Sequence, residues 1–344
     1  MSEADGAGWK VGRSIILELD LAISIACARA GPGLGTGEIA ALVAGTPARL
    51  RREFVRMFGE PRRLHATMEA AALAAGVLEE DDIEAAAGAM RGLDLAGAVA
   101  ALEDLRERRG IAGQAADAPA GTVTRSAVTL SPVARPPAGT VTRFVEAYVH
   151  LKAALYAELG FAPASLGPLL AEARVDAERG ALILAGGREG EAFWPWLDRF
   201  HSEVYLPWRQ GREEAMLELE RRASSELGAP ERGTGIPPTA WLSEKNPLLR
   251  FGELGSSLRE GSCRPLFWAE PFGIADLWVA TPTGCIVSIA GPGPAFEAFL
   301  GRFEEAARKV QAIADPTRLV MLCLIRQIGM TNSDMAAYLG IARP

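Results

Sequence analysis

Residues 303–344, FEEAARKVQAIADPTRLVMLCLIRQIGMTNSDMAAYLGIARP, carry the most specific pattern in the chain. Asp315 is placed to cap a helix, Pro316 suits the first helical position, and apolar residues follow at helical spacing. Thr331 is placed to cap a second, short helix over residues 332–339, which closes at a glycine. A helix, a break, a short helix and a tight turn together predict the first half of a helix-turn-helix.

The same segment resembles the ArsR/SmtB family of bacterial winged-helix repressors. The resemblance covers residues 306–344 and is carried by ADPTRL at 314–319 and DMAAYL at 334–339. In that family a recognition helix, a β-wing and a dimerising helix follow, so the resemblance implies a homodimer that binds operator DNA. The residues that it places at the DNA are Thr331, Asn332, Ser333 and Arg343.

The family's recognition helix would begin after Pro344, where this sequence stops. Because that helix and the wing carry most base and phosphate contacts, we expect the 344-residue chain to bind DNA weakly or not measurably. A form that continues past Pro344 is expected to bind a palindrome, with an affinity that falls steeply as salt rises. Two interpretations stay open: a truncated helix-turn-helix, or a remnant that no longer reads DNA.

Composition describes a globular protein with an acidic body. The chain has 344 residues, of which 49% are hydrophobic and 23% charged, enough for two or three domains. A formal net charge of −7 argues against a generally basic nucleic-acid coat. Residues 301–344 hold six Lys or Arg against four Asp or Glu, which suits a small DNA-reading module on a larger domain.

No stretch has the pattern of a signal peptide or a membrane span, so we expect a cytoplasmic protein without a membrane partner. The apolar run at residues 15–30 is interrupted by Glu18, Asp20 and Arg29. The cysteines lie far apart without a CxxC pair, which indicates buried hydrophobic side chains in a reducing compartment. They are Cys27, Cys263, Cys285 and Cys323. With no histidine close to a cysteine in sequence, we predict neither a metal site nor a cofactor.

Changes of composition divide the chain into four expected parts. Residues 111–142 are rich in Pro, Gly, Ala and Thr, and the heptapeptide PAGTVTR occurs at 119–125 and again at 137–143. Such a stretch lacks the large apolar residues of a core and predicts a linker. The expected parts are a helical domain (1–110), the linker (111–142), a sensor domain (143–295), and a connecting helix with the incomplete helix-turn-helix (296–344).

Helical periodicity dominates outside the Pro/Gly-rich stretches, so the predicted fold class is mainly α with one small antiparallel sheet. The expected strands cover residues 266–269, 277–281 and 285–290, and TPTG at 281–284 is a hairpin turn. Residues 181–185 are either a short strand or a helix end. A helical block is expected from residue 191 to residue 227.

The stretch GPGLGTG at residues 31–37 has the glycines of a phosphate-binding loop. A dinucleotide fingerprint needs a preceding strand, whereas residues 18–21 have a helical pattern. No Gly-Lys-Ser/Thr follows either. We therefore predict a structural loop before a helix that starts near Thr36, although a helix start there could hold an anion.

Aromatic side chains are concentrated in FWPWLDRFHSEVYLPWR at residues 193–209. Large rigid rings with a few polar groups suit a pocket for a flat or apolar ligand. The candidate ligand-binding residues are Trp194, Trp196, His201, Tyr205, Trp208 and Arg209. The other interpretation, which these residue types favour, is aromatic packing between two helices.

These patterns favour a ligand-responsive transcriptional repressor in which a small-molecule effector acts on a sensor that precedes the DNA-binding segment. The alternative is a small-molecule- or protein-binding module with a helix-turn-helix remnant. No catalytic residues are predicted, because His201 lacks a Ser or Cys nucleophile pattern such as GxSxG. We therefore expect no enzymatic activity.

Overall fold

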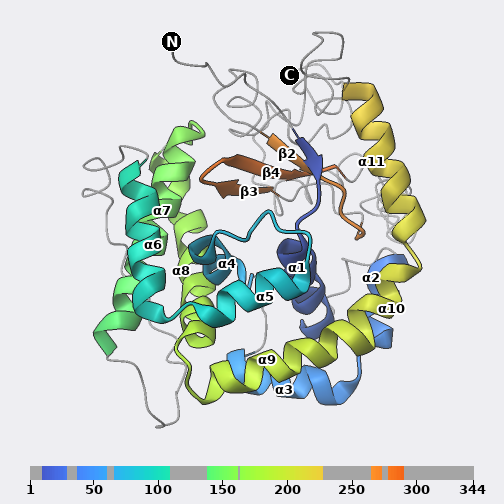
Figure 1. Ribbon diagram of the computed structural model, residues 1–344, viewed down its shortest axis with the longest axis horizontal. Coiled ribbons are helices and arrows are strands. Elements are labelled where there is room, and N and C mark those ends of the chain that lie inside the picture. The colour runs from blue at the N-terminus through green and yellow to red at the C-terminus, as the bar shows by residue number, and fades with distance from the viewer. Residues whose placement is uncertain are drawn as a thin grey trace, which may run out of the picture.

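The computed structural model describes residues 10–28, 37–59, 66–108, 138–161, 163–227, 265–272 and 278–289. Helices make up most of these residues and surround one small sheet, which confirms the predicted mainly helical class (Figure 1). The predicted connecting helix, helix-turn-helix and DNA contacts in residues 296–344 lie outside the described residues.

Helices and strands are largely separate along the described parts of the chain. The described helices lie within the first 227 residues, and three of the four described strands follow them. The helices are α1 (Ile15–Cys27), α2 (Gly37–Gly45), α3 (Ala48–Phe58), α4 (Glu69–Ala75), α5 (Ile83–Gly92), α6 (Leu95–Arg108), α7 (Ala138–Glu158), α8 (Pro163–Leu184), α9 (Arg188–Phe200), the π-helix η1 (His201–Tyr205), α10 (Leu206–Gln210) and α11 (Glu213–Leu227). The strands are β1 (Lys10–Gly12), β2 (Pro265–Trp268), β3 (Trp278–Thr281) and β4 (Gly284–Ser288).

Helix α1 is the central element of the fold. Ser14 caps its start, because the Ser14 hydroxyl accepts a hydrogen bond from the Leu17 amide at 3.2 Å and donates one to the Leu78 carbonyl at 2.6 Å. Every residue from Ile16 to Cys27 is buried, and α2, α3, α4 and α5 pack around it. Helix α1 is therefore buried on all sides and forms the centre of the hydrophobic core.

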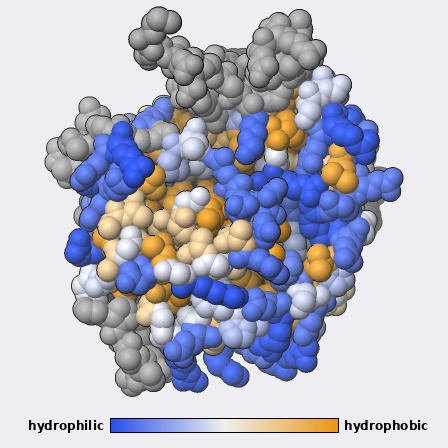
Figure 2. Space-filling view, viewed as in Figure 1, coloured by the Kyte–Doolittle hydropathy of each residue, from blue (hydrophilic) through white to orange (hydrophobic). Residues whose placement is uncertain are grey.

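The acidic residues that interrupt the apolar run of α1, Glu18 and Asp20, are themselves buried inside the protein. Among the described helices, none is by itself long and apolar enough to cross a membrane; α5 and α6 meet that test only when joined across a bend of 105°. Figure 2 shows one face of the molecule, where charged and polar side chains surround a hydrophobic area in the region of α4 and α6.

Helices α7 and α8 form a long pair that packs against α6 and α4 (Figure 1). Helix α7 begins at Ala138, so the last residues of the predicted linker are helical, with Val141 packed against the core. The prediction placed that start too late because AGTVT has little hydrophobic periodicity by itself. Residues 181–184 end helix α8, which settles the strand-or-helix alternative in favour of the helix.

One hydrophobic core joins the segments on the two sides of residues 109–137. At Gly180 of α8, an added Cβ would lie 3.0 Å from the Ala70 Cβ and 3.3 Å from the Ala71 amide nitrogen. Only a residue without a side chain allows α8 and α4 to approach so closely. The described residues between 10 and 108 and between 138 and 227 therefore pack around a shared core.

The sheet is mixed, with strand order β1–β2–β4–β3, and this corrects the predicted all-antiparallel sheet. The predicted hairpin is confirmed: β3 and β4 pair antiparallel, with Thr281 opposite Gly284. Strand β2 instead pairs parallel with β4, and β1, from the other end of the chain, pairs parallel with β2. Strand β1 has only three residues, KVG, which are too few to show an alternation of apolar and polar side chains, so no local pattern predicts it.

Candidate functional site

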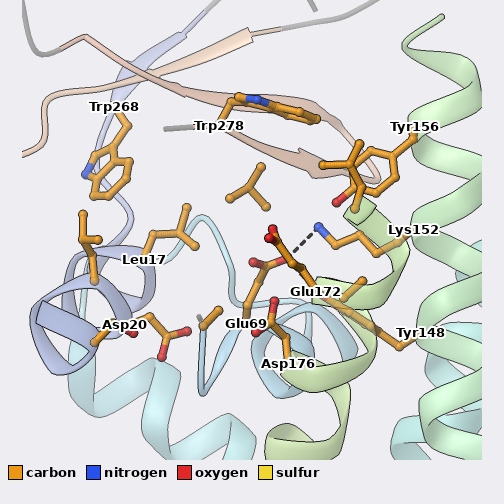
Figure 3. A pocket seen from close by; sticks show the side chains of 16 residues that line it. Leu17, Asp20, Glu69, Tyr148, Lys152, Tyr156, Glu172, Asp176, Trp268 and Trp278 are labelled. Carbon is orange, nitrogen blue, oxygen red and sulfur yellow. Dashed lines mark hydrogen bonds and ion pairs between the residues drawn. The ribbon is translucent and has the colours of Figure 1, made fainter. Parts of the chain in front are cut away.

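A cavity of about 260 Å³ lies between α1, α4, α7, α8 and the sheet. Figure 3 shows acidic side chains at its floor, Lys152 and Tyr156 on one side, and tryptophans of the sheet opposite the acids. Its walls therefore combine charge with large aromatic surface, the combination that ligand pockets use for orientation and for affinity.

Helix α7 supplies one wall through Tyr148, Lys152 and Tyr156. Their spacing of four residues places the three side chains on one face of the helix. All three are buried, and the exposed fraction of Lys152 is only 2%. The same helix face thus packs in the core and lines the cavity.

Lys152 and Glu69 form a buried ion pair at the cavity, with the Lys152 Nζ 2.6 Å from the Glu69 Oε1. The Tyr148 hydroxyl donates a hydrogen bond to the same oxygen at 2.7 Å, and the Lys152 ammonium donates to the Ala280 carbonyl at 3.0 Å. Burial has the largest single effect and lowers the pKa of Lys152, but Glu69, Tyr156 and Asp176 together outweigh it, so the pKa is raised. Lys152 is therefore protonated at neutral pH and unsuited to act as an amine nucleophile.

Asp20 lies at the cavity edge, where α1 meets the start of α4. Its carboxyl oxygens accept hydrogen bonds from the Thr67 amide at 2.8 Å and from the Met68 amide at 2.8 and 2.9 Å. Burial raises the pKa of Asp20 to about 8, the two amides oppose that shift, and repulsion from Glu69 and Asp176 adds to it. Asp20 is therefore mostly protonated at neutral pH.

Glu172 and Asp176 of α8, one helical turn apart, complete the acidic side of the cavity. Both are half-buried, and their carboxyl groups point into the cavity near that of Glu69 (Figure 3). Within the described ranges, no three His, Cys, Asp or Glu side chains are arranged to hold a metal ion.

Two tryptophans of the sheet, Trp268 on β2 and Trp278 on β3, face these carboxyl groups (Figure 3). Trp278 stacks on Phe161 with ring centroids 5.1 Å apart and meets Tyr156 edge to face at 5.7 Å. These contacts fix the indole of Trp278 before any ligand arrives, which lowers the entropy cost of binding against it.

The predicted ligand-binding residues divide among the core, a second cavity and, for Trp194, a half-buried position outside both cavities. Trp196 is only 1% exposed; it stacks on Phe200 with centroids 5.2 Å apart and donates from Nε1 to the Leu50 carbonyl at 2.9 Å. Trp208 stacks on Phe272 at 4.9 Å. For these two rings the structure shows packing between elements, which was the alternative interpretation.

His201, Tyr205 and Arg209 line a second cavity of about 520 Å³, beside α1 and α11. Arg209 Nε donates to the Glu18 carboxylate at 2.9 Å, and the Tyr205 hydroxyl donates to the same carboxylate. The Trp268 indole nitrogen also reaches Glu18, at 3.5 Å. This buried carboxylate therefore connects α1 with α10 and with strand β2 at the edge of the first cavity.

Trp194 is half-buried, lies outside both cavities and holds the Arg91 guanidinium 5.0 Å from its ring centroid. The five residues of η1 form a widened π-turn just before Pro207, whose ring would collide with the carbonyl of Glu203 in a regular α-helix. That turn changes the helical register, so the α-helical spacing of about 3.6 residues per turn does not hold across η1.

Sequence reasoning missed the first cavity, although two of its signals were visible. Asp20 was noted only as an interruption of an apolar run, yet a carboxyl group on an otherwise apolar core helix marks a buried polar site. Tyr148 is the second signal, because a tyrosine hydroxyl that is buried with its ring requires a polar partner. The contribution of Trp268 and Trp278 depended on sheet pairing that the sequence did not reveal.

The cysteine prediction is confirmed for Cys27 and Cys285, which are buried; Cys263 and Cys323 lie outside the described residues. Residues 31–36 of the glycine-rich loop also lie outside them, and α2 begins directly afterwards at Gly37, as expected. Comparison of the chain with protein-family models, with curated proteins and with solved structures finds no match.

Proposed function

We propose that the protein is a ligand-responsive, DNA-binding transcriptional repressor, and that the cavity between α1, α4, α7, α8 and the sheet holds its effector. The observation that carries the proposal is that this cavity reaches the sheet through Trp268 and Trp278. Trp268 lies on β2 and Trp278 on β3, and β4 pairs with both of these strands. Strand β4 is also the last described strand before residues 290–344. Those residues contain the sequence that resembles an ArsR-type helix-turn-helix.

In this proposal the effector acts by favouring one arrangement of the sheet over another. A ligand shifts an equilibrium only when it binds the two states with different affinity. Contacts to indoles on β2 and β3 would provide that difference, and β4 would transmit it along the chain to the DNA-binding segment. In a homodimer, a change at each segment alters the spacing of two recognition helices relative to a palindrome.

A second candidate function uses the same cavity without DNA: a small-molecule-binding module with a helix-turn-helix remnant. The cavity and its aromatic wall favour ligand binding in either case. Only the behaviour of residues 303–344 toward DNA separates the two candidates.

Selection from a random DNA library tests the DNA-binding half of the proposal. The chain is compared with a form extended by any sequence that its gene encodes after Pro344. The extended form is expected to enrich a palindrome, with an affinity that falls as salt rises. Arg343→Ala should weaken binding across sequences and reduce the salt slope by about one. Arg221→Ala, at an exposed residue of α11, is the matched control. Absence of an enriched sequence for both forms would leave the binding module as the better account.

A further inference from the structure

We infer that the effector held in this cavity is a small, uncharged carbonyl compound. Its oxygen accepts hydrogen bonds from the Tyr156 hydroxyl and the Lys152 ammonium, and its planar body lies against Trp278. The inference rests on the proposed function only in calling the ligand an effector. Binding of such a compound can be confirmed or rejected without any measurement on DNA.

The Tyr156 hydroxyl is a polar group without a partner in the described parts of the fold. Tyr156 lines the cavity and is only 8% exposed. Its hydroxyl points toward the cavity, and no hydrogen bond joins it to any described residue (Figure 3). The neighbouring Tyr148, by contrast, donates its hydroxyl proton to Glu69 at 2.7 Å. Because buried hydroxyl groups have hydrogen-bond partners in folded proteins, an open one at a cavity indicates a ligand atom at this position.

Tyr156 can act as a donor at neutral pH. Burial raises the pKa of its hydroxyl above the ordinary value of 10.0, and the nearby Lys152 ammonium offsets that shift only in part. The hydroxyl therefore keeps its proton. It can donate this proton to an acceptor atom of a ligand.

Lys152 supplies a second donor, one helical turn away on the same face of α7. An ammonium group has three N–H bonds. Described residues accept two of them: the Glu69 Oε1 at 2.6 Å and the Ala280 carbonyl at 3.0 Å. The Lys152 Nζ lies 5.8 Å from the centroid of the Tyr156 ring, which brings the two donors into the same part of the cavity. A carbonyl oxygen has two lone pairs near its plane and can accept from both donors.

The charged groups around the cavity already interact with other residues, which favours an uncharged ligand. Glu69 is paired with Lys152, and Asp176 interacts electrostatically with a buried arginine of α8. Asp20 is mostly protonated at neutral pH, and Glu172 has an interaction partner of its own. A charged ligand would lose its hydration without meeting a counter-charge that lacks a partner.

The aromatic wall and the volume restrict the shape of the ligand. Trp278 stacks on Phe161 with ring centroids 5.1 Å apart and meets Tyr156 edge to face, so it presents a fixed flat surface. A carbonyl group conjugated with a ring is planar and can stack on that surface. A cavity of about 260 Å³ lies just below the usual range of about 300–1,000 Å³ for ligand pockets, which favours a compound with a single ring.

Isothermal titration calorimetry on the full chain at pH 7 tests the ligand class with probes of nearly equal shape. Acetophenone is compared with α-methylstyrene, in which a CH₂ group replaces the carbonyl oxygen, and with 1-phenylethanol. Acetophenone should bind at least about tenfold more tightly than α-methylstyrene, because only its oxygen satisfies the two donors. It should also bind more tightly than the alcohol, whose tetrahedral carbon breaks the plane.

Benzamide, benzamidinium and benzoate test the charge requirement, because they place a neutral group, a cation and an anion on the same planar frame. Benzamide should bind, and each ion should bind at least about tenfold more weakly.

Two tyrosine variants locate the site. Tyr156→Phe removes only a hydroxyl without a partner in the described fold, so the melting temperature should stay near that of the wild type. The preference for acetophenone over α-methylstyrene should fall by about three- to tenfold, while the affinity for α-methylstyrene stays unchanged. Tyr205→Phe, the matched control, removes a hydroxyl that donates to Glu18 outside this cavity. It should lower the melting temperature and leave the preference unchanged.

Several results would overturn the inference: no binding of acetophenone or benzamide, equal binding of α-methylstyrene or the alcohol, either ion binding as tightly as benzamide, or a Tyr156→Phe protein that keeps the full preference. Carbonyl binding by a protein that selects no DNA would support this ligand class and reject the regulator. Operator binding that only a charged compound releases would reject this ligand class and support the regulator.

Discussion

Replacing Asp20 by Asn should change how the stability of the protein depends on pH. In the folded protein the pKa of Asp20 is raised from 3.8 to about 8, mainly by burial. Between these values the folded state holds a proton that the unfolded state has released. The free energy of unfolding therefore falls as pH rises through this window, and the penalty is absent below about pH 4 and complete above about pH 8.

The magnitude follows from the size of the shift. One pKa unit corresponds to about 1.4 kcal/mol, so a shift of about four units costs the folded protein up to about 6 kcal/mol at high pH. From pH 5 to pH 7 the wild type should lose about 3 kcal/mol relative to Asp20→Asn, which has no proton to release. The asparagine carbonyl can still accept the hydrogen bonds from Thr67 and Met68 that now reach Oδ1.

Denaturant unfolding at pH 5, 6 and 7 measures this difference directly. Asp198→Asn, at a residue whose side chain is 65% exposed, provides the control and should keep the wild-type pH slope. Parallel stability curves for wild type and Asp20→Asn, or a gap that narrows as pH rises, would refute the reasoning. Asp20 would then be ionised in the fold, and its two amide hydrogen bonds would outweigh its burial.

The remaining predictions separate core residues from site residues. Trp196→Ala should cost about 3–5 kcal/mol of stability, whereas Trp278→Ala should cost less, because its ring is only half-buried. Lys152→Met should destabilise by about 3–5 kcal/mol by leaving the Glu69 carboxylate buried without its cation; adding Glu69→Gln should restore most of this loss in a double-mutant cycle. Partial burial lowers the pKa of His201, so its NMR titration midpoint should lie below the ordinary value of about 6.5.

Local patterns in the sequence were sufficient for the helices and for the hairpin. Helical periodicity predicted a mainly helical chain, and the TPTG turn predicted the β3–β4 hairpin, because both signals act between residues close in sequence. The parallel pairing of β2 with β4 joins strands that do not form a hairpin. The pairing of β1 with β2 joins residues more than 250 positions apart. No local pattern in the sequence encodes either pairing.

The candidate site shows the same division between local and long-range information. Aromatic density led to residues 193–209 as the candidate ligand site, but Trp196 and Trp208 pack in the core. The cavity instead collects Asp20, Glu69 and Lys152 from three helices that are far apart in sequence. Asp20 alone gives a local signal, as a carboxyl group in an apolar run, whereas Glu69 and Lys152 have the pattern of ordinary charged positions. Only the fold shows that the three share one buried space.

Hydrogen exchange of the full chain, with and without a saturating small molecule found to bind in the cavity, tests most directly whether the cavity communicates with the C-terminal segment. The account predicts slower exchange in α7 and in strands β2 to β4, accompanied by altered exchange in residues 314–339. Protection confined to the cavity walls, with exchange in residues 314–339 unchanged at saturation, would contradict it.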